Sequence, residues 1–311
     1  MSAVAKLTNH RETLQKYFDE QRAVLTAFAY ATTYSWIDFF NFDFRIIDGC
    51  LCIFAANAIG TFLYLPPLGK RVSRNVIRSC FAQMEERNGG SGVTRIENVP
   101  YEMLKHFPTD QYEFVPKNDE YIYWRQDIAD YRGNDYKSKR SAYNGFVKNY
   151  PDHEYLPFEH GMMDECLGMC DVWASDRMAF GLDNNMYCAM IEEARVMNAR
   201  LLRGAGELGL VGRVVRVKGK IRGYTFGFRM RDDMFCVLLE VTHPEYRGLP
   251  AYIFREFSDD KEVRPYKFLN VMDDCGAENL AWTKMSFRPT LLLKSYIVKK
   301  IDPRAKQFAA G

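Results

Sequence analysis

The chain has 311 residues, of which 47% are hydrophobic and 26% are charged, a composition that excludes a disordered or fibrous protein. Its length is sufficient for two domains of ordinary size. The formal net charge is only +2, so the whole molecule has no strong attraction for nucleic acid or anionic lipid, and any electrostatic function depends on local clusters.

The first half of the chain predicts a helix, a hairpin, a strand and a second helix. Apolar residues at helical spacing follow the candidate caps Thr8 and Asn9, which predicts a helix over residues 8–33. Residues 46–54 alternate around Asp48-Gly49, a dipeptide typical of a tight hairpin turn. The other elements expected here are a strand over 61–65, an amphipathic helix over 74–87 that ends at Gly89-Gly90-Ser91-Gly92, and a short aromatic strand over 121–124.

The second half repeats this order of elements. The expected elements are a basic helix over 137–150, a long helix over 186–202, a hairpin over 214–228 around Lys218-Gly219-Lys220, a strand over 234–241, helices over 250–259 and 278–285, and strands over 266–271 and 290–300. The run from Met234 to Val241 is almost entirely apolar, which is typical of a central strand buried on both faces.

This order of elements is that of the GNAT acyltransferase fold, and it occurs twice. The sequence therefore predicts an α/β protein with mixed, α+β-type sheets and two GNAT-like domains in tandem, over residues 1–130 and 131–311. Only the second domain has an acid near the end of its central strand. We expect this domain to contain the site and the first to be its structural partner.

The eight cysteines lie mostly within apolar runs and include no pair of Cys-x-x-Cys motifs. This pattern favours reduced cysteines that pack as small apolar side chains, in a reducing compartment, over a zinc site. The first residues lack the apolar stretch of a signal peptide, and the most apolar segment, residues 46–65, is interrupted by polar residues and glycines. We therefore expect a cytoplasmic protein without a transmembrane segment and without a metal.

Several segments resemble the DUF2156 family. They are the basic helix from Tyr136 to Lys148, the stretch from Phe268 to Gly276, the Lys284-Met285-Ser286-Phe287-Arg288-Pro289 motif and the Leu65-Pro66-Pro67-Leu68-Gly69 turn. This family resembles the C-terminal catalytic region of phosphatidylglycerol lysyltransferases, which has a tandem GNAT fold. The resemblance covers nearly the whole chain, and it implies a transferase that takes an acyl or aminoacyl group from a donor.

The chain departs from the family pattern at two places. It has Asn270-Val271-Met272 where the family often has Asn-Arg-Glu before an acidic pair. It also has Leu293-Lys294-Ser295-Tyr296 before the terminal Lys-x-Tyr-like element. In the lysyltransferases membrane-spanning helices precede this region, and the sequence predicts none here.

The candidate acid/base residues follow the ends of the predicted strands. Acyl transfer to a nucleophile requires removal of its proton, and a partly buried carboxylate or imidazole can accept it. Glu240 ends the central strand and His243 follows it, while Asp273 and Asp274 follow the next strand. Each also has a structural interpretation: an ion pair for Glu240, a surface position for His243 and a helix cap for the aspartates. Tyr296 is a candidate proton donor that packing alone would also explain.

A donor loop is expected before the helix over 250–259. The Arg/Gln-x-x-Gly-x-Gly/Ala loop of acetyltransferases binds pyrophosphate through free backbone N–H groups. The matching stretch here offers Arg247, Gly248 and Ala251, but its spacing is incomplete and Pro250 lacks an N–H. It is interpreted either as a coenzyme A loop or as a plain turn.

Basic residues concentrate between Arg195 and Arg231, where ten lysines and arginines accompany a single acid, Glu207. With the basic helix near residue 140, they predict a face for the acceptor arm of tRNA, with solvation alone as the alternative. The candidate nucleic-acid-binding residues are Lys137, Lys139, Arg140, Arg216, Lys218, Lys220 and Arg222.

Three functional hypotheses follow. The first is an acyl- or aminoacyltransferase with aminoacyl-tRNA as donor, Glu240 as proton acceptor, and a small molecule, a peptide or a lipid headgroup as acceptor. The second is a coenzyme-A-dependent N-acyltransferase. The third is a non-catalytic binding protein on the same scaffold.

Overall fold

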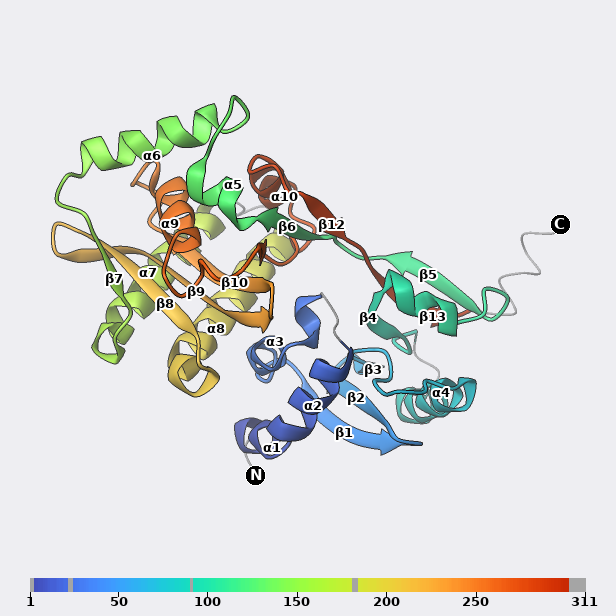
Figure 1. The fold of residues 1–311 in the computed structure, drawn as a ribbon. Helices are drawn as coiled ribbons and strands as arrows, with labels where there is room; N and C mark the ends of the chain where they lie inside the picture. Colours follow the sequence, from blue (N-terminus) through green and yellow to red (C-terminus); the bar gives the residue numbers. More distant parts are fainter. Residues whose placement is uncertain (1–2, 22–24, 90–91, 181–183, 302–311) are drawn as a thin grey trace. The chain divides into compact units, whose positions relative to one another are not determined.

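The computed structural model describes residues 3–21, 25–89, 92–180 and 184–301 of the chain (Figure 1). The chain divides into two compact units: residues 1–119 with 293–311, and residues 120–292. The expected boundary between residues 130 and 131 falls inside the second unit, at the end of α5 (Arg125–Asp130). Each unit has a sheet of its own.

The first unit has a six-stranded sheet in the order β1-β2-β3-β4-β13-β5. Its elements are α1 (Ala3–Asn9), α2 (Arg11–Gln21), η1 (Thr26–Phe28), α3 (Tyr30–Ser35), β1 (Asn41–Ile47), β2 (Cys50–Asn57), β3 (Gly60–Leu63), α4 (Arg74–Asn88), β4 (Ile96–Pro100), η2 (Tyr101–His106), β5 (Tyr112–Pro116) and β13 (Ser295–Lys300). The expected hairpin is confirmed: Asp48 and Gly49, both with positive φ, join β1 to β2.

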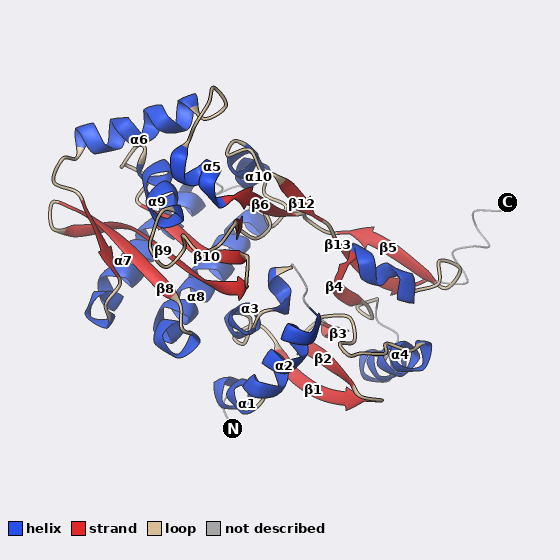
Figure 2. Cartoon of the chain, viewed as in Figure 1, coloured by secondary structure: helices blue, strands red, loops and turns tan. Residues whose placement is uncertain are grey.

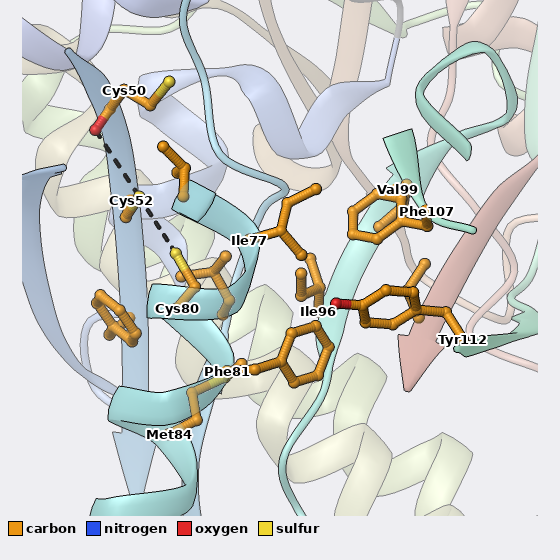
Figure 3. Close-up of a cluster of buried hydrophobic side chains, with 14 residues drawn as sticks. Cys50, Cys52, Ile77, Cys80, Phe81, Met84, Ile96, Val99, Phe107 and Tyr112 are labelled. Carbon is orange, nitrogen blue, oxygen red and sulfur yellow. Dashed lines mark hydrogen bonds between the residues drawn. The ribbon is translucent and has the colours of Figure 1, made fainter. Parts of the chain in front are cut away.

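A buried cluster joins the sheet of the first unit to α4 (Figure 3). Ser73 caps this helix by accepting a hydrogen bond from the Val76 N–H, and Gly89 ends it with φ of 55°. Cys80 on α4 and Cys52 on β2 are both buried, with their Sγ atoms 3.4 Å apart. All eight cysteines are free thiols, and these two pack within the apolar cluster as the sequence predicts.

The continuous helix expected over residues 8–33 is wrong. The chain forms α1, α2, a 3-10 turn and α3 instead, and residues 22–24 lie outside the described residues. Leu25 and Ala29 have extended backbones, which end any helix at those positions. Every residue of η1 and α3 is buried, so tertiary packing decides the backbone there over intrinsic helix propensity.

The second unit has a seven-stranded sheet in the order β12-β6-β11-β10-β9-β8-β7. Besides α5, its elements are β6 (Glu120–Trp124), α6 (Lys137–Asn149), β7 (Glu154–Pro157), η3 (His160–Met162), α7 (Met163–Phe180), α8 (Asn185–Leu208), β8 (Val211–Val217), β9 (Lys220–Arg231), β10 (Met234–Thr242), α9 (Leu249–Ser258), β11 (Phe268–Asn270), α10 (Glu278–Met285) and β12 (Leu291–Leu293). The single closing strand expected over 290–300 is therefore two strands, because β12 joins this sheet and β13 joins the first.

Strand β10 lies at the centre of this sheet, as the sequence predicts. It pairs with β9 along its whole length, but with the parallel β11 only over Met234–Cys236. Beyond Cys236, β10 and β11 no longer pair, so the second half of β10 has a hydrogen-bonded neighbour on one side only. A bulge between Val237 and Leu239 shifts the register with β9 at the same level. Such a bulge changes the side of the sheet to which the following residues point.

Helices cover both faces of this sheet (Figure 2). On β9, the Tyr224 hydroxyl donates to Asn198 of α8, whereas a Cβ on the neighbouring Gly223 would lie 3.3 Å from Leu249 of α9. Successive strand residues point to opposite faces, so α8 and α9 lie on opposite sides. Thr225 lies two residues after Gly223 on β9, so both point to the same face of the sheet. Glu240 pairs directly with Thr225, and its side chain is therefore also on the α9 side.

The close approach of β9 and β10 requires a glycine at position 227. A Cβ there would lie 2.3 Å from the Cys236 carbonyl oxygen and 2.3 Å from the Phe235 ring. We expect Gly227→Ala to lower the free energy of unfolding by about 1–3 kcal/mol, measured by urea denaturation. Gly206→Ala is the matched control because its Cβ would meet no atom within 4 Å in α8, and it should be neutral or stabilising. Equal stabilities of the two variants would contradict the close approach.

Candidate active site

The ends of the parallel strands β10 and β11 form the candidate site of the second unit. Such strand ends commonly hold ligands in α/β sheets, and here β10 and β11 also separate before β10 ends. Glu240 comes from β10, and Asp273 and Asp274 come from the loop that follows β11. The structure thus places three of the predicted catalytic residues at one end of the sheet.

Glu240 has an unusual electrostatic environment. The residue is exposed at the surface, yet the protein atoms packed around its carboxylate desolvate it and raise its pKa to about 8, while Lys284 acts in the opposite direction. The carboxylate also raises the pKa of the buried Tyr123 and Tyr131, whose shifts are due first to burial, so both phenols lie within its electrostatic range. A carboxylate with a pKa near neutrality suits proton transfer.

The loop after β11 is held by Lys284 of α10. Its ammonium donates to the carbonyl oxygens of Val271, at 2.8 Å, Met272, at 3.3 Å, and Asp273. Met272 has φ of 63°, a conformation that is costly for a residue with a side chain. Burial lowers the pKa of Lys284, and Asp273 is the largest opposing influence. We infer that this lysine positions the loop, because three successive carbonyls converge on it.

Asp274 has a structural role in the same loop. It is buried, and it accepts hydrogen bonds from the Tyr121 hydroxyl, at 2.6 Å, and from the Gly276 N–H, at 2.9 Å. Asp273 is half-buried and accepts from the Cys275 N–H at 3.0 Å. At the end of β11, just before this loop, the Asn270 amide donates to the buried Glu120 carboxylate at 2.6 Å. The two aspartates therefore shape the loop beside Glu240.

The other two predicted catalytic residues are His243, in the turn after β10, and Tyr296, on β13. The backbone of His243 donates to the Arg222 carbonyl, and its Nδ1 accepts from the Glu245 N–H at 3.4 Å, so one ring nitrogen is used within the turn. Tyr296 lies on β13 in the sheet of the first unit, where it pairs with Val99 and Pro116. The second unit therefore brings Glu240, Asp273 and Asp274 together without Tyr296.

The expected donor loop leads into α9 and is covered by α6. A Cβ on Gly248 would lie 2.3 Å from the Ala142 carbonyl oxygen of α6, and φ of this glycine is 87°. Ala251 is buried and Arg247 is exposed. Aromatic contacts between Phe146 and Tyr252, with ring centroids 4.7 Å apart, continue the packing of α6 along α9. Together with Pro250, this packing leaves little free backbone for a pyrophosphate.

The predicted basic face is partly neutralised by ion pairs within the protein. Several of the arginines between 195 and 231 form ion pairs with carboxylates, namely Arg195, Arg213, Arg216, Arg229 and Arg231. Arg140 donates to the Tyr131 and Gly133 carbonyls, and Arg222 lies over the Tyr246 ring. Of the candidate residues, Lys137, Lys218 and Lys220 are exposed. The three exposed lysines lie at the start of α6 and in the β8–β9 turn.

Lys139, a predicted nucleic-acid-binding residue, is half-buried rather than exposed. Its ammonium donates to the Ser286 hydroxyl at 2.6 Å and lies 3.6 Å from the centre of the Phe287 ring. Burial lowers its pKa to about 8. This lysine joins α6 to the segment after α10, so packing explains its position.

The comparisons with known proteins agree with this fold. Residues 23–299 match the family described as phosphatidylglycerol lysyltransferase, C-terminal. The chain belongs to this family. The resemblance of the chain to the C-terminal region of the lysyltransferases is thus confirmed. A comparison with curated proteins finds no match.

Several solved structures share the fold of this chain. A conserved protein of unknown function from Bacteroides thetaiotaomicron has 25% identity and a TM-score of 0.75, over 88% of this chain and 90% of that one. L-PGS from Bacillus licheniformis has 13% identity and a TM-score of 0.63, over 96% and 94%. A tandem GNAT protein from the clavulanic acid biosynthesis pathway has 10% identity and a TM-score of 0.50, over 97% and 98%.

These similarities confirm the tandem GNAT-like acyltransferase fold, and the family is one of transferases. Among the described residues, no helix combines the length and the apolar character needed to cross a bilayer. Lys284 was not among the predicted catalytic or binding residues, although it begins the motif that carries part of the resemblance. Its place at the start of that motif was the available signal.

The positioning role of Lys284 can be tested directly. We expect Lys284→Met to lower the free energy of unfolding by about 1–3 kcal/mol, because the carbonyls of residues 271–273 lose their charged donor. Hydrogen exchange should accelerate at the amides of residues 271–276. The exposed Lys294 provides the control Lys294→Met, which should leave both quantities unchanged. Unchanged exchange in the Lys284 variant would exclude the positioning role.

Proposed function

We propose that this chain transfers an aminoacyl group from aminoacyl-tRNA to a nucleophilic acceptor. The observation that carries the proposal is Glu240, an exposed carboxylate with a pKa of about 8 at the end of the central strand, beyond the point where β11 stops pairing. Membership of the lysyltransferase family supports an aminoacyl donor and a lipid acceptor such as phosphatidylglycerol.

The proposed step is acyl transfer assisted by a general base. The acceptor hydroxyl attacks the ester carbonyl carbon of the aminoacyl-tRNA, and Glu240 removes its proton. The bond between this carbon and the 3′ oxygen of the terminal ribose then breaks, and the proton returns to that oxygen. The ammonium of Lys284 and the loop that it holds lie beside Glu240, where they would favour its ionised form.

The packing of α6 over the start of α9 favours this donor over coenzyme A. Gly248, which a coenzyme A loop would leave facing the pyrophosphate, abuts the Ala142 carbonyl instead. Pro250 removes one further donor from the first turn of α9. Thermal shift with acetyl-coenzyme A should accordingly give no stabilisation, and a clear stabilisation would favour the N-acyltransferase alternative.

A transfer assay tests the proposal. The full chain is incubated with charged tRNA carrying a labelled amino acid, lysine first, and with phosphatidylglycerol vesicles, and the label in the lipid phase is measured. Transfer that depends on the chain supports the proposal, and label in water-soluble amines would assign a different acceptor. No transfer from any charged tRNA, together with no tRNA mobility shift at low salt, would favour the non-catalytic binding protein.

A further inference from the structure

The first unit contains a cavity of its own, of about 200 Å³. Arg74, Ile77 and Arg78 of α4 line one side, and residues between 106 and 112, at the end of η2 and the start of β5, line the other. This volume is smaller than the roughly 300–1,000 Å³ of sites that enclose drug-sized ligands. The cavity therefore fits a small group or the end of a larger molecule.

The floor of this cavity belongs to a packed core. Ile77 and Tyr112 are both buried members of the cluster in Figure 3. The Tyr112 ring contacts Phe81, with centroids 5.3 Å apart, and Phe107, at 5.6 Å. These contacts fix the apolar floor before any ligand binds, and a preformed site loses less entropy on binding.

The rim of the cavity is positively charged. Residues 70–84 include Lys70, Arg71, Arg74 and Arg78 but no aspartate or glutamate. Arg74 and Arg78 are exposed, and within the described part of the chain neither forms an ion pair, although Arg78 donates to the Asn75 side chain. By contrast, Arg87 on the same helix pairs with Asp43 at 2.9 Å. The two arginines at the cavity thus keep their charge available.

The other polar groups of the lining complement an anion. Gln111 supplies an amide, and His106 and Tyr112 supply an imidazole and a hydroxyl. Burial lowers the pKa of His106, with a smaller contribution from Lys105, so at pH 7 the imidazole is mostly neutral and offers one N–H. The lining contains no carboxylate that would repel an anion.

We propose that this cavity binds a phosphoryl group, with Arg74 and Arg78 as its main ligands. Guanidinium groups match the geometry of phosphate oxygens and form charge-assisted hydrogen bonds with them. The apolar surface of Ile77, Pro108 and the Tyr112 ring would contact a short carbon chain next to the phosphate, as in a glycerol phosphate. This site goes beyond the proposed reaction, whose residues all lie in the second unit.

Binding by the full chain is measured with three probes: inorganic phosphate, glycerol phosphate, and vesicles of phosphatidylglycerol compared with phosphatidylcholine. We expect the R74A/R78A double variant to weaken binding about 10–100-fold. Gln111→Glu keeps both arginines but adds a carboxylate to the lining, and it should also weaken binding. The control is Arg132→Ala, which changes an 86% exposed arginine of the second unit and should bind as the wild type. Melting temperatures without ligand show whether each variant is folded.

The outcomes separate the sources of the phosphate. Binding of soluble glycerol phosphate that is lost in the double variant indicates a small phosphoester. Binding of phosphatidylglycerol vesicles alone, lost in the double variant, indicates a lipid headgroup. Absence of binding to all three probes, or binding that the R74A/R78A and Gln111→Glu variants leave unchanged, would overturn the proposal. Transfer activity is a separate measurement, so failure here leaves the proposed reaction intact.

Discussion

Glu240→Gln is expected to lower the turnover of aminoacyl transfer by about 10²–10⁴-fold, the usual contribution of a positioned general base. Glutamine preserves the size and polarity of the side chain but cannot accept the proton. Initial rates with charged tRNA and phosphatidylglycerol vesicles measure the effect. The control is Glu245→Gln, an exposed acid in the neighbouring turn, which should keep wild-type rates. Full activity of the Glu240 variant would remove this residue from the mechanism.

The pH dependence gives a second readout of the same group. A base with a pKa of about 8 is mostly protonated at pH 6.5, so the wild-type rate should rise as the pH approaches and passes 8. The residual rate of the Glu240→Gln variant should lack this rise. A wild-type profile that is flat between pH 6 and 9 would contradict the assignment of Glu240 as the base.

The same pKa predicts a change in stability with a definite sign. The folded-state pKa of about 8 lies above the unfolded value near 4.5, so between these pH values the folded chain binds more protons at Glu240. The contribution of this group to stability therefore falls as the pH rises from about 4.5 to about 8. Relative to the wild type, Glu240→Gln should gain stability over this range, as measured by urea denaturation at pH 5 and pH 8.5. A stability difference that is independent of pH would exclude a raised pKa.

The elements that the sequence predicts well are those with a strong local signal. The apolar run from Met234 to Val241 predicts a strand buried on both faces, and β10 is central. Asp48-Gly49 and Lys218-Gly219 predict tight turns, and all four residues have positive φ. Glu240 was predicted because its position at the end of a strand can be read from the sequence alone.

The features that could not be predicted depend on contacts between distant segments. Residues 295–300 alternate like any strand, and only the pairing with β4 and β5 assigns them to the first sheet. Likewise, the positive charge of Arg216 is evident in the sequence, but Glu165, 2.8 Å away, comes from α7. That helix was itself missed, because its apolar residues have no helical periodicity. The expected basic face was overestimated for this reason.

The ion pair between Arg213 and Asp260 gives the largest expected effect on stability. The two side chains are only 9% and 8% exposed, and they form two hydrogen bonds, of 2.6 Å and 2.8 Å, between β8 and the segment after α9. Asp260 also accepts from the Glu262 N–H and from the Tyr155 hydroxyl. The pair therefore links two segments 47 positions apart in the chain.

Asp260→Ala should lower the free energy of unfolding by about 3–5 kcal/mol, because it leaves the Arg213 charge buried without a partner. Arg213→Met should cost a similar amount by leaving the carboxylate unpaired.

The double variant Arg213→Met/Asp260→Leu removes both charges and should recover most of the loss, since buried ion pairs are often replaceable by apolar residues. A double-mutant cycle with urea denaturation measures the coupling. The exposed pair of Arg264 and Asp259, at 2.9 Å, provides the comparison, and its disruption should have a much smaller effect because solvent screens both charges. Additive losses at Arg213 and Asp260 would show that the two charges are solvated separately in solution, and the link between β8 and the segment after α9 would then have to come from apolar packing.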